Sequence, residues 1–196
     1  MKYTLTGLML MFCVVSQAQK SWHYGIKADL NLSNIHGKGM GTGFVSGYQG
    51  GGFLAYDLNK KWGFQAEVLA SQNNTKRSGD FQTYYNVNGN YYASENVKLT
   101  YLNIPVLARY RVSDSWSFVA GPQVGFLLTD NENLLNYNQR AFKTYEVSGV
   151  LGAEFNISNV ALYARYNAGI SDINDADNRY SWRSQHIQAG IAVRLK

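Results

Sequence analysis

The chain has 196 residues, of which 16% are charged and 14% aromatic, with a formal net charge of +5. The length suits one domain, and the single cysteine excludes a disulfide-stapled scaffold. Beyond the N-terminus, no apolar run approaches the roughly 18 residues of a membrane-spanning helix, which excludes a helical membrane protein. A membrane β-barrel stays open, because its apolar residues are hidden in alternation.

Residues 1–18 are predicted to be a secretory signal peptide. Lys2 supplies the positive charge, Leu5–Val15 is a short apolar core, and Ser16 and Ala18 are small residues at the positions that a signal peptidase reads. The alternative is a buried N-terminal helix. We therefore expect a barrel domain at residues 19–196, which leaves out Cys13 and so has no thiol nucleophile.

From residue 22 onward, apolar and polar residues alternate with the period of a β-strand. The segment Trp22–Leu32 alternates throughout its length. Soluble strands average about five or six residues, whereas tilted membrane strands need about 9–11. Eight such segments are predicted, at residues 22–32, 48–58, 62–72, 98–111, 116–128, 145–157, 160–170 and 185–195.

The connections alternate in length. Tight turns at 59–61, 113–115 and 158–159 separate long loops at 33–47, 73–97, 129–144 and 171–184. Outer-membrane barrels have short periplasmic turns and long extracellular loops. The sequence thus predicts an all-β fold, an eight-stranded antiparallel transmembrane up-and-down barrel in the outer membrane. Trp22, Trp62 and Trp116 each begin an odd-numbered strand on the apolar face, which predicts a periplasmic aromatic girdle.

A soluble barrel of the lipocalin kind is the alternative fold. Its polar face would point into water and would normally carry many Lys and Glu residues. Here the polar face is rich in Gly, Ser, Asn and Gln, and its few charges are of both signs. This composition favours a membrane barrel with a polar lumen.

The two-residue connection Ser158–Asn159 predicts a tight hairpin that pairs residue 157 with residue 160. In this register Gly152 lies opposite Arg165, and Glu154 becomes a diagonal neighbour of Arg165 on the lumen face.

Because buried charges must be paired, we predict a lumen polar network of Glu67, Arg109, Glu154 and Arg165. Further members would be Arg111, Glu146 and Arg194. We interpret this network as a structural plug that holds the strands in register; a gated ion path is the alternative.

Five segments in this order resemble the PorT-like outer-membrane β-barrel family of Bacteroidetes-type bacteria: Tyr24–Ser33, Gln65–Gln72, Tyr101–Leu107, Gly121–Gly125 and Ala164–Ile173. The resemblance implies an eight-stranded outer-membrane barrel without a catalytic site. Barrels of this type usually end in an aromatic residue, whereas this chain ends in Arg194-Leu195-Lys196.

An eight-stranded barrel is just wide enough for side chains to fill its interior. We therefore expect a plugged, monomeric barrel in outer-membrane lipid, with a structural or interaction role carried by its extracellular loops. An envelope protein or a glycan would be the partner. No enzyme activity, cofactor or metal site is expected, and the scattered positive charge argues against nucleic-acid binding. The alternatives are a rim enzyme acting on lipid or peptide through His186 and Ser184, or a narrow solute or ion channel.

Two loop segments stand out. Residues 37–43 are glycine-rich like a phosphate cradle, but no helix follows, so a flexible surface loop is expected. The second long loop holds Tyr84, Tyr85, Tyr91 and Tyr92, with Asn88-Gly89 as a turn signal. This pattern predicts a hairpin that extends the barrel wall, and a binding surface is the alternative.

Overall fold

The structure, a computed structural model, describes residues 22–85, 96–130, 135, 141–177 and 179–196. The predicted signal peptide at 1–18 and the Asn88-Gly89 turn lie outside the described residues. Within them the protein has eight strands and one short helix. The strands are β1 (Trp22–His36), β2 (Val45–Asp57), β3 (Trp62–Lys76), β4 (Asn96–Arg111), β5 (Trp116–Asp130), β6 (Tyr145–Ile157), β7 (Val160–Gly169) and β8 (Arg183–Arg194); the helix is α2 (Phe81–Tyr84).

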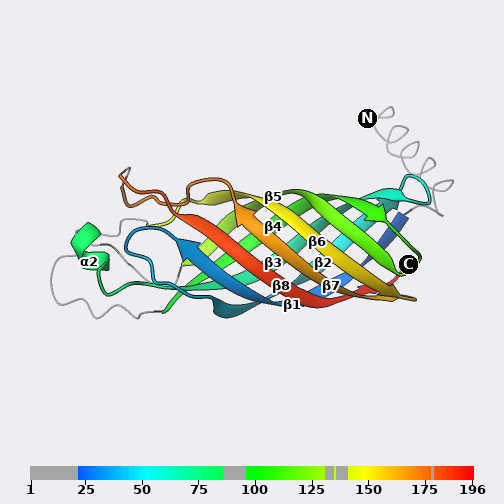
Figure 1. Cartoon of the computed structure of the whole chain (residues 1–196), viewed down its shortest axis with the longest axis horizontal. Coiled ribbons are helices and arrows are strands. Elements are labelled where there is room, and N and C mark those ends of the chain that lie inside the picture. Colours follow the sequence, from blue (N-terminus) through cyan, green and yellow to red (C-terminus); the bar gives the residue numbers. More distant parts are fainter. Residues whose placement is uncertain (1–21, 86–95, 131–134, 136–140, 178) are drawn as a thin grey trace, which may run out of the picture.

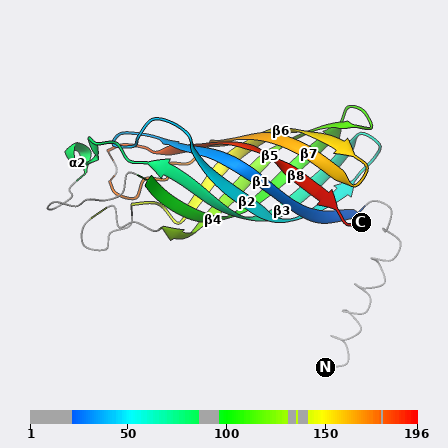
Figure 2. The ribbon, with the colours of Figure 1, turned by 90° about the horizontal axis from the view of Figure 1, so that it is seen from below.

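All eight strands are antiparallel to their neighbours, and β1 pairs with β8, so the sheet closes into a barrel. The predicted up-and-down barrel is thereby confirmed. The tight turns and the C-terminus lie at one end, called here the short-turn end, and α2 and the long connections lie at the other, the long-loop end (Figures 1 and 2). No helix among the described residues is both long and apolar enough to cross a membrane.

The wall of the barrel is apolar outside and polar inside. Along β3, exposed and buried residues alternate from Trp62 onward, with Val68 55% exposed and its neighbour Glu67 only 1% exposed. Leu30 on β1 is 72% exposed. A soluble barrel would bury the apolar face, so this wall requires an apolar surrounding medium.

The strands end close to their predicted positions at the short-turn end, and all except β6 and β7 run further than predicted at the long-loop end. β1 continues to His36 and β3 to Lys76, and pairs such as Ser33↔Val45 and Lys76↔Asn96 extend the ladder. Beyond the apolar band, the backbones of neighbouring strands stay paired. Apolar and polar residues alternate less regularly there, so the sequence pattern does not show the full length of the strands.

The β6–β7 hairpin has the predicted register. Ile157 pairs with Val160, and Gly152 lies opposite Arg165. Ser158 has a φ of 56°, in the left-handed region that the tight two-residue hairpin turns require.

Two loop predictions were wrong in the described residues. Phe81–Tyr84 forms the helix α2 instead of a strand, since Phe81 and Tyr85 turn inward and are buried. The glycine-rich segment is not a free surface loop either, because Met40 bridges to Arg77 and is 6% exposed.

Candidate functional site

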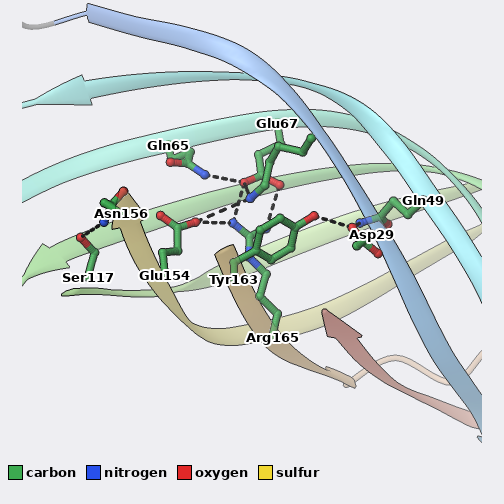
Figure 3. A network of polar contacts seen from close by, with 10 residues as sticks. Asp29, Gln49, Gln65, Glu67, Ser117, Glu154, Asn156, Tyr163 and Arg165 are labelled. Carbon is green, nitrogen blue, oxygen red and sulfur yellow. Dashed lines mark hydrogen bonds and ion pairs between the residues drawn. The ribbon is translucent and has the colours of Figure 1, made fainter. Parts of the chain in front are cut away.

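Four charged side chains meet in the middle of the lumen and form what we call the ion cluster: Lys27, Glu67, Glu154 and Arg165. Figure 3 labels the last three of them. They come from β1, β3, β6 and β7 and are at most 6% exposed. Two cations face two carboxylates, so the cluster is neutral overall. Such balance is needed because an unpaired buried charge costs several kcal/mol.

Arg165 holds the ion cluster together. Its Nη1 donates to Glu67 Oε2 at 2.8 Å and its Nη2 to Glu67 Oε1 at 2.7 Å, and Nη2 also donates to Glu154 Oε1 at 3.0 Å. Lys27 Nζ donates to Glu67 Oε1 at 3.0 Å and lies 3.6 Å from Glu154 Oε1. The two-pronged contact between Arg165 and Glu67 fixes the orientation of both groups.

Further polar side chains contact the cluster or lie beside it. Tyr163 donates its hydroxyl to Asp29 Oδ2 at 2.6 Å, and Gln49 Nε2 donates to the same oxygen at 3.0 Å. Lys27 Nζ lies 3.9 Å from the centre of the Tyr163 ring, a cation–π contact. Gln65 Nε2 adds a bond to Glu67 Oε1 at 2.6 Å. These contacts join side chains from β1, β2, β3, β6 and β7 across the lumen.

The structure brings three of the four predicted network residues together and leaves Arg109 apart. Arg109 contacts Asp57 near the short-turn end, where Arg111 Nη2 also donates to Asp57 at 3.2 Å. The prediction for Arg109 was wrong because residue charge does not give position along the barrel axis, and that position places Arg109 beside Asp57. Asp57 is the last residue of β2 and pairs with Gly63 on β3, which in turn pairs with Arg109 on β4.

Sequence reasoning missed Lys27 as a member of the ion cluster. Lys27 and Asp29 stood on the polar face of the cleanest alternating segment, so the alternation already placed them in the lumen. Tyr163, in contrast, broke the alternation. Its ring is buried against the ion cluster. Leu69, Tyr101 and Leu107 also interrupt the alternation, and all three are buried.

Glu146 and His186 lie in a separate lumen region toward the long-loop end. The Ser184 hydroxyl donates to Glu146 Oε1, and no charged partner of Glu146 is found among the described residues. His186 is 5% exposed and its Nδ1 has no hydrogen-bond partner in the described part of the chain. Ser184 and His186 therefore make no hydrogen bond to one another, as a hydrolytic pair would.

The long loops close the barrel with a loop cap, a hydrophobic cluster that all four long connections build together. Trp182 lies at its centre and is fully buried, with its ring 5.3 Å from Phe142 and 5.4 Å from Tyr85. Its Nε1 donates to Tyr85 Oη at 2.9 Å and to the Lys38 carbonyl at 3.2 Å. The buried members are Ile35, Met40, Phe81, Tyr85, Val97, Leu99, Tyr101, Leu135, Ala141, Phe142, Ile173 and Trp182.

Comparison with protein families decides the identity of this barrel. The sequence signature described as "Outer membrane protein beta-barrel domain" matches residues 16–175, which is more than half of the chain. The chain belongs to this family. It is an outer-membrane protein, and its apolar outer wall faces lipid. No curated protein sequence matches the chain.

Solved outer-membrane barrels share the fold of this family member at low sequence identity. Ail of Yersinia pestis, solved with the heparin analogue sucrose octasulfate, is 14% identical with a TM-score of 0.53, over 89% of this chain and 99% of Ail. Neisserial surface protein A is 15% identical (TM-score 0.54; 87% and 96% covered), and OprG of Pseudomonas aeruginosa is 12% identical (0.53; 90% and 97%). At these identities the likeness concerns the fold alone.

An aromatic rim surrounds most of the short-turn end of this outer-membrane barrel. Each of the three predicted tryptophans points outward and packs on an aromatic residue directly across the strand pair, with ring centroids 4.7–5.0 Å apart. The fourth odd strand, β7, begins with Val160 and has aliphatic neighbours. The aromatic pairs are Trp22–Tyr56, Trp62–Tyr110 and Trp116–Phe155, and the aliphatic positions are Ile157, Val160 and Val193.

Proposed function

We propose that this protein is a non-conducting outer-membrane barrel with a structural or interaction role carried by its extracellular loops. One observation carries the proposal: the lumen has two closures in series, the ion cluster in the middle and the loop cap at the long-loop end. A solute would have to break both to pass. In this proposal the long-loop end is extracellular, as in barrels with short periplasmic turns.

Planar-bilayer recording tests the closed lumen. The purified, folded protein is expected to give no stepwise conductance, with a known porin as the positive control. Arg165→Met together with Trp182→Ala removes one residue from each closure and is the matched variant in which leakage is expected. Regular unitary steps from the unmodified protein would contradict the proposal and favour the narrow channel.

The loop cap supports an interaction role because it organises the outer surface. Arg179 illustrates this: its side chain is 66% exposed, yet its Nε donates to Asp177 at 2.8 Å and its Nη2 to the Tyr84 carbonyl at 2.7 Å. A surface ordered before binding loses less entropy when a partner binds. We propose an envelope protein or a glycan as the partner, and a monomer in outer-membrane lipid, since the closed sheet offers no free strand edge.

Site-specific photo-crosslinking in intact cells tests the loop role. A photoreactive residue at Arg179 is expected to capture a partner. One at Lys61, in a turn of the opposite rim, is the control position and should not capture the same species. If Arg179 gives no adduct with envelope protein or glycan while Lys61 does, the outer loops are not the interaction surface.

The absence of an enzyme activity is part of the proposal. Ser184 and His186 lie buried inside the lumen below the loop cap, where a lipid or peptide substrate at the rim does not reach them. We further propose membership of the PorT-like group, supported by the five segments named above, and removal of residues 1–18 on export. N-terminal sequencing of the outer-membrane form should begin at Gln19.

A further inference from the structure

A water-accessible vestibule of about 400 Å³ lies inside the barrel at the short-turn end. It is bordered by the tight turns and by the ends of the strands, and three arginines line it: Arg109 and Arg111 on β4 and Arg194 on β8. Its volume falls in the range of about 300–1,000 Å³ that small-molecule sites occupy.

The vestibule carries an excess of positive charge. Asp57 is paired with both Arg109 and Arg111, and its Oδ2 lies 3.0 Å from His23 Nε2. Asp114, in the turn before β5, is the other acidic residue of the lining. Three guanidinium groups thus face two carboxylates. Low-dielectric walls around such an excess concentrate its attraction for anions.

Most guanidinium donors of the vestibule are not used by the protein. A guanidinium group has five N–H donors. Arg111 donates hydrogen bonds to Asp57 and to the Lys60 carbonyl, and Arg109 donates one to Asp57. The side chain of Arg194 makes no hydrogen bond or ion pair with any described residue, and its Nε is buried without an acceptor. A donor without an acceptor is unfavourable in a buried site. Because Arg194 lines the vestibule, an anion there can pair with the rest of its guanidinium group.

We propose that the vestibule is a binding site for a small oxyanion that carries phosphate or carboxylate groups. Arg194 and Arg111 would donate to it from two sides, and Arg109 would be held in position by Asp57. The planar fork of a guanidinium matches the oxygens of phosphate and carboxylate groups in pairs. This site lies at the opposite end from the loop cap, so it is independent of the interaction role proposed for the outer loops.

Isothermal titration calorimetry with inorganic phosphate tests the site. The full-length folded protein is used in non-ionic detergent at constant ionic strength, with chloride as the competing anion. Saturable binding is expected for the unmodified protein. Arg194→Gln and Arg111→Gln are each expected to weaken it about tenfold or more, the effect of losing a charge-assisted hydrogen bond. Because the two arginines lie on different strands, one variant remains informative if the other fails to fold, which heat-modifiable gel mobility reports.

Lys61→Gln is the matched control. It removes one positive charge from the same rim, but the side chain is exposed and does not line the vestibule. Its phosphate affinity should equal that of the unmodified protein. The proposal is overturned if the unmodified protein shows no saturable binding at millimolar phosphate, or if Lys61→Gln weakens binding as much as Arg194→Gln does.

A second arm distinguishes a soluble anion from a lipid headgroup, which presents the same phosphate chemistry. The titration is repeated after addition of a short-chain phosphatidylglycerol. If the lipid competes with phosphate, the site takes a headgroup; if it does not, the site takes a soluble anion. Either result supports the site and identifies its source.

Discussion

The ion cluster and the loop cap close the same barrel by opposite means. The ion cluster consists of charged side chains that project from four regular strands, so strand register alone brings them together. The loop cap is apolar, and segments far apart in the chain must fold onto one another to build it. A charged side chain that loses its partner in the lumen stays buried and cannot be hydrated. The loops of the cap, in contrast, can separate from one another while the strands of the barrel stay paired. The first closure is therefore coupled to the stability of the whole barrel and the second is coupled mainly to the loops.

The largest effect is expected from Arg165→Met. It removes the three hydrogen bonds to Glu67 and Glu154 and leaves two buried carboxylates with Lys27 alone. Breaking a buried ion pair in this way costs about 3–5 kcal/mol. The free energy of unfolding in lipid vesicles, measured by urea titration, should fall by that amount.

Arg179→Met is the control for this loss. The Arg179 side chain is 66% exposed and pairs with Asp177, so its removal should cost less than about 1 kcal/mol. Equal losses for the two variants would show that burial of the ion cluster does not matter to the stability of the wall.

Trp182→Ala is expected to open the loop cap without unfolding the barrel. Truncating a buried tryptophan leaves a cavity that costs about 3 kcal/mol. The loops should then be cut rapidly by protease, while heat-modifiable gel mobility still reports a folded wall. Loss of the folded gel band would mean that the cap and the wall are one cooperative unit.

Gly152→Ala tests whether register makes room for the ion cluster. A Cβ at Gly152 would lie 2.5 Å from Arg165 Cγ and 2.7 Å from the Ala164 carbonyl oxygen. Such overpacking costs about 1–3 kcal/mol, measured as a shift in the urea midpoint. Gly149→Ala on the same strand is the control, because its Cβ would meet only Ile170 Cδ1 at 3.8 Å. The two variants should differ clearly in stability.

The smallest effect is a pH dependence of the cap. Burial raises the pKa of Asp172, but N–H bonds from Asn174 and Trp182 and the charge of Lys143 outweigh it and hold the pKa below the ordinary 3.8. The resulting stability is complete above pH about 3.8 and is lost as the pH falls through the lowered pKa.

Because the Asp172 side chain is 35% exposed, this contribution is less than about 1 kcal/mol. Protection of the loops from an acid-active protease should fall on acidification. Asp172→Asn should remove that change. An unchanged pH profile in the variant would show that another group is responsible.

The strands of the barrel wall were predictable because they follow from patterns among residues that are close together in the sequence. Period-two alternation located the strands, and the two-residue turn at Ser158 fixed the register that brings Glu154 beside Arg165. The same alternation placed Lys27 on the lumen face. It does not show how far β1 is displaced relative to β3 along the barrel axis. That axial displacement decides which charges meet, and it separates Arg109 from Glu67.

The loop cap was not predictable on these grounds. Phe81, Phe142 and Trp182 lie in loops with no periodicity, so their residue types do not show that they pack together. The segment around Tyr84 and Tyr85 was expected to form one side of a hairpin because Asn88-Gly89 is a turn signal. Burial of Tyr85 beside Trp182 overrides that local signal, and α2 forms instead.

The aliphatic gap in the aromatic rim, at Ile157, Val160 and Val193, has a consequence for how the barrel sits in its bilayer. Tryptophan and tyrosine rings settle at the level of the lipid headgroups, while aliphatic side chains prefer the hydrocarbon below. The β7 side should therefore sink further into the membrane than the opposite side. The barrel axis is then expected to tilt away from the membrane normal, so that the long loops lean toward one side of the cell surface.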